Sequence, residues 1–423
     1  MPASTAHSAM TSDSRLRKDT GRPLACARAS EVASTLPHHG PKGQSELRSL
    51  GQAEAYPTRG ACFSLPAGRQ PGLGLRDTNG NEAQPATFFN RAMYRALLIV
   101  AALAVSPLHS ADPPQAGISN GVIHAKLYLP DAANGYYRAT RFDWSGVISS
   151  LEFQGHNYFG VWFPRYDPKL HDAITGPVEE YRTGDSGLGY DEAKVGGTFV
   201  RIGVGLLKKP EEERFGQFET YEIVDNGKWT TKTSEDAVEF THVLADPSSG
   251  YAYLYKKTVR LAKNEPRLII EHSLKNTGQK TIETNVYNHG FFVIDGQPSG
   301  PDFTVKFPFD VKAVADLQGL AEVQGRELHY LKELQPGGQS VFTQLTGYGD
   351  SARDFDFRVE NRKTGAGVHV AGDRPLWKIN FWSIRTTVCP EDFINMKIEP
   401  GKESQWRITY DFYVLPPAGK EHP

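Results

Sequence analysis

Cysteine is scarce in this sequence, and so are long apolar runs and any excess of charge of one sign. The chain has 423 residues and three cysteines, Cys26, Cys62 and Cys389. Only Cys389 lies in the part that is expected to fold, which excludes an internal disulfide there and leaves stability to a buried core. The formal net charge of −2 gives no reason to expect nucleic acid or an acidic membrane as a partner.

Motifs that would bring a metal or a cofactor are also missing. The sequence contains no Gly-rich phosphate loop and no nucleophile elbow. Its scattered histidines show no metal-ligand spacing such as a helical His-Glu-x-x-His. These histidines include His124, His156, His171, His242, His272 and His369. We therefore expect neither a metal nor a cofactor.

The first quarter of the chain lacks the patterns of a folded domain. Residues up to about 89 are rich in Ala, Ser, Gly, Pro and Arg, and they cannot bury enough apolar surface to offset the entropy of ordering. Residues 93–111 have a short charged start at Met93, an apolar run and then small residues, which is typical of a secretory signal peptide. The run is too short for an ordinary transmembrane helix.

This arrangement predicts that Met93 is the true start and that residues 1–92 are a disordered or wrongly assigned extension. The alternative is a genuine disordered leader followed by a membrane anchor. No cysteine follows the predicted signal to accept a lipid, so we expect a soluble periplasmic or secreted protein with no membrane association after cleavage. Residues 112–423 are expected to form a single domain, and the sequence does not indicate an oligomeric state.

What the sequence does contain is alternation of apolar and polar residues, which indicates strands with one buried face. The runs that show it are Val200–Leu206, Val238–Leu244, Tyr251–Tyr255, Leu268–Leu274, Phe355–Val359 and Trp406–Val414. Turn chemistry separates them, and Asp225-Asn226-Gly227-Lys228 is the strongest hairpin signal because Asn and Gly tolerate positive φ. Many strands joined by short turns predict an all-β domain, either a sandwich or a barrel.

Two segments carry candidate catalytic groups. His289 lies between Asn288 and a run of aromatic residues on a predicted strand, and histidine is a natural general acid near neutral pH. Glu391 follows Cys389-Pro390 about a hundred residues later and could serve as a general base. Taken singly, each residue is better explained in plainer terms, as a hydrogen-bonded structural histidine and as a solvated loop glutamate.

Taken together, the two segments resemble the galactose mutarotase-like superfamily, which includes aldose 1-epimerases and the hexose-6-phosphate 1-epimerase group. The resemblance rests on Asn-His followed by aromatics, then Cys-x-Glu, then a Pro-Gly turn into a strand ending in Tyr-x-Phe, and covers roughly Tyr251 to Leu415. The segment from Arg141 to Leu151 resembles an early strand of the family. The resemblance implies a large antiparallel β-sandwich with a shallow sugar cleft.

The resemblance also implies roles for individual residues. His289 matches the general acid and Glu391 the general base, and the two would act on opposite sides of a sugar ring to open and reclose it without a cofactor. Asn288 and either Arg138 or Arg141 match sugar-binding positions.

Two further segments are candidates for contacts with a sugar. The family's early His-Gly-Gly segment is absent, and its nearest substitute is the polar loop that begins at His171, for which a plain surface loop is an equal alternative. In Trp377–Ser383 an aromatic such as Trp382 could stack on a sugar, although tryptophan in a β core is more common.

Three functions remain open at this point. The first is an exported carbohydrate-active isomerase that acts at the anomeric carbon like an aldose 1-epimerase. The second is a non-catalytic carbohydrate-binding sandwich. The third is a module associated with a glycan lyase or hydrolase, since similar sandwiches serve several activities. A catalyst requires His289 and Glu391 to face one cleft, whereas a binding module requires only aromatic rings and hydrogen-bond donors.

Overall fold

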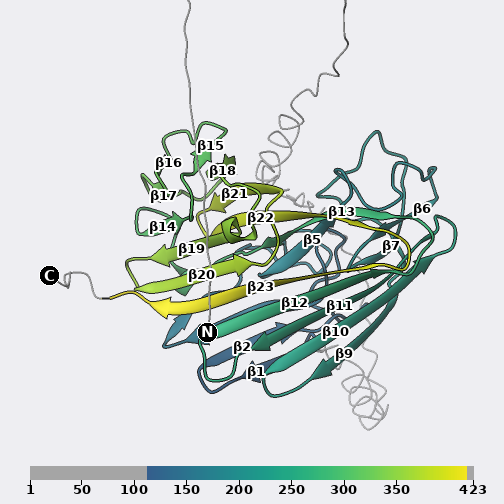
Figure 1. Ribbon diagram of the computed structural model, residues 1–423, viewed down its shortest axis with the longest axis horizontal. Helices are drawn as coiled ribbons and strands as arrows, with labels where there is room; N and C mark the ends of the chain where they lie inside the picture. Colours follow the sequence, from purple (N-terminus) through teal and green to yellow (C-terminus); the bar gives the residue numbers. More distant parts are fainter. Residues whose placement is uncertain (1–111, 417–423) are drawn as a thin grey trace, which may run out of the picture. The chain divides into compact units, whose positions relative to one another are not determined.

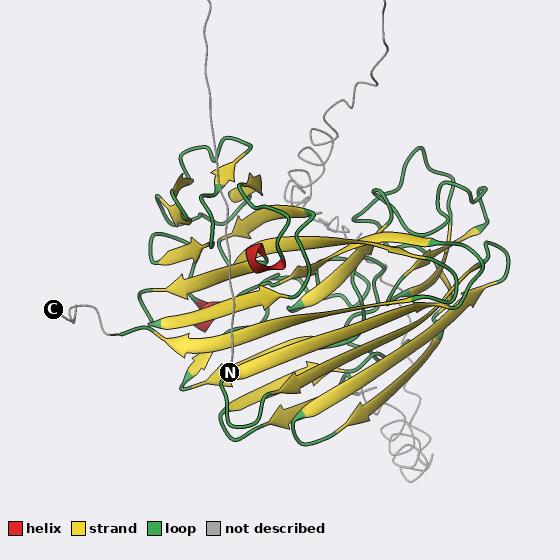
Figure 2. Cartoon of the chain, in the orientation of Figure 1, coloured by secondary structure: helices red, strands yellow, loops and turns green. Residues whose placement is uncertain are grey.

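A computed structural model of the chain describes residues 112–416, and these are almost entirely β-strands joined by turns and loops (Figures 1 and 2). The predicted extension (1–92) and signal peptide (93–111) lie outside the described residues. Within the described range, no helix is long and apolar enough to cross a membrane. The all-β fold class is confirmed, and the architecture consists of large sheets in which every strand pair is antiparallel.

The largest sheet has ten strands in the order β16-β17-β14-β19-β20-β23-β12-β11-β10-β9. Their bounds are β9 Lys228–Thr233, β10 Ala237–Asp246, β11 Tyr251–Leu261, β12 Arg267–Asn276, β14 Phe303–Lys306, β16 Ala321–Gln324, β17 Glu327–Tyr330, β19 Asp356–Asn361, β20 Ala366–Gly372 and β23 Glu403–Val414. Strand β11 buries every second residue, as its alternating sequence predicts. One face of this sheet therefore packs inside the protein.

The second large sheet has six strands in the order β15-β18-β21-β22-β13-β5. Their bounds are β5 Val178–Arg182, β13 Ile282–His289, β15 Lys312–Ala313, β18 Ser340–Thr346, β21 Lys378–Ile384 and β22 Thr387–Ile398. Strand β5 is buried along its whole length, and β13 along most of it. Burial on both faces means that something covers each side of this sheet.

Two smaller sheets and two short 3₁₀ turns complete the described structure. The four-stranded sheet contains β1 Gln115–Ser119, β2 Ile123–Tyr128, β3 Val147–Phe153 and β4 His156–Asn157. The three-stranded sheet contains β6 Thr198–Arg201, β7 Gly205–Lys208 and β8 Ile223–Asp225. The 3₁₀ turns are η1 Ile294–Gly296 and η2 Ala352–Asp354.

Two apolar clusters lie on the two sides of the six-stranded sheet. The larger combines side chains from the ten-, six- and four-stranded sheets, among them Val286, Ile394 and Ile408. The smaller gathers residues from the loops after β2 and β4, from the three-stranded sheet and from the opposite face of β22, such as Phe142 and Cys389. These loops therefore cover the face of the six-stranded sheet that points away from the ten-stranded sheet.

The structure differs from the expected strands in two places. The alternating run Val200–Leu206 is not one strand, because the chain reverses at Ile202–Val204 and pairs β6 with β7. Gly203, with φ of +76°, permits this reversal. The turn at Asp225–Lys228 exists, but it does not close a hairpin, since β8 pairs with β7 while β9 pairs with β10.

Candidate active site

The six-stranded sheet brings the two predicted catalytic residues together by strand register. His289 of β13 lies directly opposite Glu391 of β22, and Glu391 lies opposite Asn380 of β21. Directly opposed residues of antiparallel strands point to the same face with Cβ atoms about 5 Å apart. The three side chains therefore form a polar row on the face that the loops cover.

His289 and Glu391 contact each other. The Nε2 atom of His289 lies 3.2 Å from Oε1 of Glu391, and the two side chains are only 3–4% exposed. Asn380 donates a hydrogen bond of 3.3 Å to the other carboxylate oxygen, Oε2. The second ring nitrogen of His289, Nδ1, is buried and has no hydrogen-bond partner among the described residues. Asn380 thus orients Glu391, while Nδ1 of His289 makes no hydrogen bond to the described residues.

Burial changes the proton affinity of both groups. It raises the pKa of Glu391 to about 7, against the opposing effect of Arg141 and the Asn380 hydrogen bond. Burial, reinforced by Arg141, lowers the pKa of His289 well below 6.5. A carboxyl that titrates near neutrality beside a neutral imidazole is a combination suited to proton transfer.

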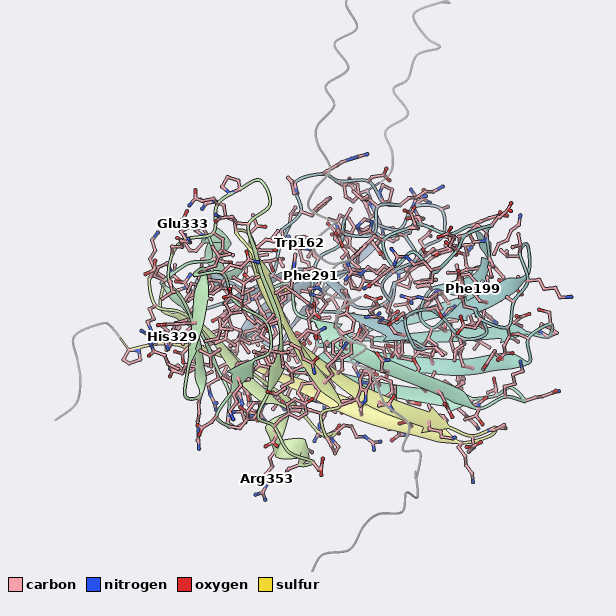
Figure 3. The ribbon with its side chains drawn as sticks, turned by 90° about the horizontal axis from the view of Figure 1, so that it is seen from above. Trp162, Phe199, Phe291, His329, Glu333 and Arg353 are labelled. Carbon is pink, nitrogen blue, oxygen red and sulfur yellow. The ribbon has the colours of Figure 1, made fainter. Side chains whose placement is uncertain are left out.

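Aromatic rings enclose the imidazole. The Phe291 ring stacks on His289 with centroids 3.6 Å apart, and Trp162 stacks on Phe291 at 4.6 Å. Trp162 and Phe291 are labelled next to each other in Figure 3. Phe142 and Trp382 approach His289 edge-on at 5.8 and 5.6 Å. Phe291 adopts a positive φ of 42°, an uncommon conformation for a non-glycine residue, and this folds its ring back over the histidine.

Arg141 comes from the loop after β2 and supplies a fixed positive charge beside the pair. Its guanidinium is held by Asp172 (Nη1–Oδ1, 2.7 Å) and Glu180 (Nε–Oε2, 3.0 Å), and it donates to the Tyr287 hydroxyl at 3.3 Å. Burial alone would raise the pKa of Glu180, but Arg141 and Arg201 outweigh it and lower that pKa to about 2. The guanidinium is therefore locked in place by two carboxylates.

The structure separates the two arginine candidates. Arg141 is 5% exposed and lies over the Phe142 ring at 4.4 Å, within the loops that cover the pair. Arg138 donates instead to the backbone carbonyl of Ala133 near the start of the same loop. His171 contacts Asp172, the partner of Arg141, through Nε2 at 3.1 Å. Arg141 and His171 thus belong to one network, and Arg138 does not share it.

Asn288 points to the opposite face of β13, as the alternation of a strand requires. There its side chain donates to Glu179 at 2.9 Å and accepts a hydrogen bond from the Tyr410 hydroxyl. Glu179 also contacts Lys257 and His272 within the core between the sheets. Asn288 therefore supports the sandwich rather than lying beside His289, and we leave it and Arg138 out of the proposed site.

Three members of the site were not foreseen from the sequence: Tyr287, Glu180 and Asn380. Tyr287 lies two residues before His289 on the same face and donates to Glu180 at 2.5 Å. Its period-two spacing from His289 was available as a signal, whereas the partners on β5 and β21 depend on strand register. Among residues 112–416, no group of three or more His, Cys, Asp or Glu side chains is arranged to hold a metal ion.

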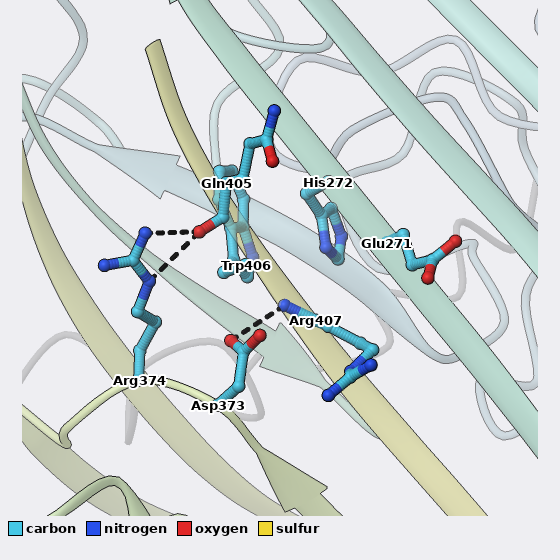
Figure 4. A pocket seen from close by; sticks show the side chains of 7 residues that line it. All are labelled: Glu271, His272, Asp373, Arg374, Gln405, Trp406 and Arg407. Atoms are coloured by element: carbon cyan, nitrogen blue, oxygen red, sulfur yellow. Dashed lines mark hydrogen bonds between the residues drawn. The ribbon is translucent and has the colours of Figure 1, made fainter.

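A separate hollow lies on the ten-stranded sheet, where β20 ends beside β23 (Figure 4). It is lined by Glu271, His272, Asp373, Arg374, Gln405, Trp406 and Arg407. Asp373 accepts a hydrogen bond from the Arg407 backbone, and Arg374 donates to the Gln405 carbonyl (Figure 4). These contacts cap the edge of β23 beyond the last β20 residue, and the hollow contains neither His289 nor Glu391.

The chain matches no protein-family model, and no curated protein matches its sequence. Solved structures that it resembles include a galactose mutarotase-like protein from Lactobacillus casei (12% identity, 71% of this chain and 100% of the other, TM-score 0.45). Others are a galactose mutarotase related enzyme from Lactobacillus acidophilus (13%, 71% and 98%, 0.44) and a galactose mutarotase-like protein from Clostridium acetobutylicum (14%, 72% and 99%, 0.43). The expected likeness is thus found among solved structures.

Proposed function

We propose that this protein binds a sugar over the His289–Glu391 pair and interconverts its two anomers by general acid–base catalysis. The observation that carries the proposal is the contact of 3.2 Å between His289 Nε2 and Glu391 Oε1 within a buried, aromatic-walled site. Opening a pyranose requires one proton to leave the anomeric hydroxyl and another to reach the ring oxygen. Both oxygens are bonded to the anomeric carbon, so a donor and an acceptor that lie side by side can serve both.

The reaction sequence balances without any further reactant. One member of the pair accepts the hydroxyl proton while the other donates a proton to the ring oxygen, and the bond between the anomeric carbon and the ring oxygen breaks. The open aldehyde rotates about its bond to the neighbouring carbon, and the ring recloses on the other face as both protons return. Arg141 would donate hydrogen bonds that hold the hydroxyl groups, since its charge is fixed by Asp172 and Glu180.

The pair must hold one transferable proton to act in this way. With the pKa of Glu391 near 7 and that of His289 well below 6.5, the ligand-free pair below about pH 7 consists of a carboxylic acid and a neutral imidazole. That state carries the same number of protons as a carboxylate beside an imidazolium, which is the assignment implied by the family resemblance. The two assignments share one protonation state of the pair, so they share one pH dependence.

Anomer exchange measured by NMR tests the proposal. The full chain would be assayed with common aldoses, their 6-phosphates and short oligosaccharides, and Glu391→Gln and His289→Ala would be compared with wild type. Each substitution removes a general acid–base group, so we expect exchange to fall by about 10²–10⁴-fold. Glu152→Gln and His124→Ala are matched controls, because both side chains are exposed on the four-stranded sheet.

Two outcomes would contradict the proposal. Exchange that is accelerated equally by wild type and Glu391→Gln would show that the pair is not the catalyst. No acceleration for any sugar, with folded protein that still binds glycans, would favour a non-catalytic carbohydrate-binding sandwich instead.

We also propose that the protein acts in the periplasm or outside the cell, on the basis of the signal-like segment from Met93. Mass spectrometry of the mature protein checks this. We expect an N-terminus near residue 112, and a peptide from residues 1–92 would contradict the assignment of Met93 as the start.

A further inference from the structure

One tryptophan is placed differently from the others. The chain has six tryptophans, and Trp377 is the one that is exposed, at 49%, while Trp144, Trp162, Trp382 and Trp406 are buried. An exposed indole loses the free energy that burying its large apolar surface would contribute, and aromatic side chains are enriched at binding surfaces. The position of Trp377 relative to the proposed site therefore needs an explanation.

A line of rings connects Trp377 to the catalytic pair. Tyr287 lies 5.7 Å from His289, Phe393 stacks on Tyr287 at 4.2 Å, and Trp377 meets Phe393 edge-on at 6.3 Å. Phe393 and Lys378 lie opposite each other, one row along the sheet from Glu391 and Asn380. Two residues of a strand span roughly 7 Å. The row of Phe393 and Lys378 therefore begins about where a sugar bound over His289 and Glu391 would end.

Contacts around Trp377 hold it in this position. Its backbone N–H donates to the Phe393 carbonyl at 2.8 Å, and the Tyr348 hydroxyl donates to its own carbonyl at 3.1 Å. The Lys378 ammonium lies 5.6 Å from the Trp377 ring and 4.3 Å from the Phe393 ring.

We infer that Trp377 is the platform of a second sugar subsite, so that the substrate class is a reducing di- or oligosaccharide rather than a single monosaccharide. This inference rests on the proposed function. Anomer exchange requires a free anomeric hydroxyl, so the reducing-end residue lies over His289 and Glu391. The next residue leaves over Lys378, which is half-buried while Phe393 beneath it is buried, and its apolar C–H face stacks on the exposed indole.

Continuity with the catalytic pair favours a saccharide over other occupants. The exposed indole is joined to His289 by adjacent ring contacts, and the lysine beside it supplies a hydrogen-bond donor at the same place. A planar ring next to a donor suits a sugar, which presents C–H groups on one face and hydroxyls at its rim.

The inference is tested with matched sugars, namely glucose and galactose against maltose, cellobiose and lactose. Anomer exchange at the reducing end would be followed by NMR for the full-length wild type, Trp377→Ala and Trp377→Phe. We expect Trp377→Ala to raise KM for at least one disaccharide about 3–10-fold, in line with the loss of one aromatic contact, and to leave KM for the monosaccharides and kcat unchanged. Trp377→Phe should retain most of the affinity.

Val243→Ala is the matched control, because Val243 is an exposed apolar residue on β10 of the other large sheet, and it should change neither KM. Equal KM changes for monosaccharide and disaccharide, or none for either, would overturn the subsite. So would self-association of the wild type that Trp377→Ala abolishes, because the indole would then be covered by a second copy.

Sugar binding, measured by indole fluorescence and by broadening of the sugar NMR lines, distinguishes failure of the subsite from failure of the proposed catalytic function. If no sugar exchanges faster with wild type, but disaccharides bind more tightly than monosaccharides in a Trp377-dependent manner, the subsite stands and the catalytic proposal falls. If no sugar binds at all, the subsite is overturned as well.

Discussion

Two neighbouring strands, β5 and β13, carry two polar clusters on their two faces, and adjacent residues contribute to both. Glu179 faces the core between the sheets, while Glu180 faces the loops and the proposed site. Asn288 and His289 divide in the same way. Both clusters are buried, so burial alone does not distinguish structure from function.

The difference lies in how each carboxylate is compensated. Glu179 contacts Lys257, His272 and Asn288. Burial would raise its pKa, but Lys257 and His272 outweigh burial and lower that pKa to about 2. Glu391 has an amide and a neutral imidazole as its direct neighbours, so burial prevails and raises its pKa to about 7. A fully paired buried charge cannot lose a partner without destabilising the fold, whereas an undercompensated one retains a proton that it can transfer.

The largest expected effect on stability comes from breaking the paired cluster. Lys257→Met leaves Glu179 and Asp143 without the ammonium that now lies between them and that also donates to the Ser145 carbonyl at 2.9 Å. Removing one partner of a buried ion pair costs about 3–5 kcal/mol. Urea unfolding followed by tryptophan fluorescence measures this loss.

Lys208→Met is the control for that measurement, since the pair of Lys208 with Glu222 is exposed and should contribute less than ~1 kcal/mol. Similar losses for both variants would show that the core cluster does not stabilise the sandwich more than a surface ion pair does.

The opposite sign is expected at Glu391. Its folded-state pKa of about 7 exceeds the ordinary value of 4.5. The free energy of unfolding therefore falls as the pH rises from about 4.5, where the carboxyl of the unfolded chain ionises, to about 7, where that of the folded chain ionises. Glu391→Gln removes this penalty, and above pH 7 it should stabilise the protein by up to about 3 kcal/mol, from 1.36 kcal/mol per pKa unit. Below about pH 4.5 the difference should vanish.

Thermal unfolding at pH 5 and pH 8 checks this sign. A variant that is less stable than wild type at pH 8 would mean that Glu391 is compensated as well as Glu179, and the contrast between the two clusters would disappear. The expected gain in stability with loss of activity is the usual trade-off at a catalytic site.

The comparison also predicts how activity depends on pH. Exchange should fall about tenfold per pH unit above about pH 7, because ionised Glu391 beside a neutral imidazole leaves no acid. It should fall again at low pH, once His289 binds a proton below its lowered pKa and no base remains. The rate is measured against the buffer-catalysed background at each pH. A rate that keeps rising above pH 8 would exclude Glu391 as the titrating group.

Much of the fold could be predicted from the sequence because alternation is a local property. The runs that became β10, β11, β12, β19 and β23 were recognised from period two alone. The sheet to which each strand belongs could not be predicted, since a turn shows that the chain reverses but not which sheet it enters. Asp225–Lys228 illustrates this, because it connects two different sheets.

The site could be predicted only in part, for the same reason. His289 and Glu391 were identified from a family resemblance, but their direct contact depends on a register between strands about a hundred residues apart. The resemblance placed them on opposite sides of a ring, whereas the structure places them side by side. Asn288 lies on the other face of β13 from His289, because adjacent residues of a strand point to opposite faces.

The smallest effect is expected at Asn380. Its substitution tests the contrast between Glu179 and Glu391, because it removes a hydrogen bond that stabilises the ionised form of Glu391. Its side-chain N–H donates to Glu391 Oε2 at 3.3 Å and so lowers the pKa of that carboxyl against the larger effect of burial. Asn380→Ala removes the donor, and a hydrogen bond of this kind is worth about 1 kcal/mol, or roughly a fivefold change in rate. The upper limb of the pH profile should therefore move to higher pH while kcat falls several-fold.

Asn395→Ala, an exposed position further along β22, is the control. A loss of activity with an unmoved limb would mean that Asn380 only supports the sheet, because a residue that orients and stabilises the carboxylate must change both.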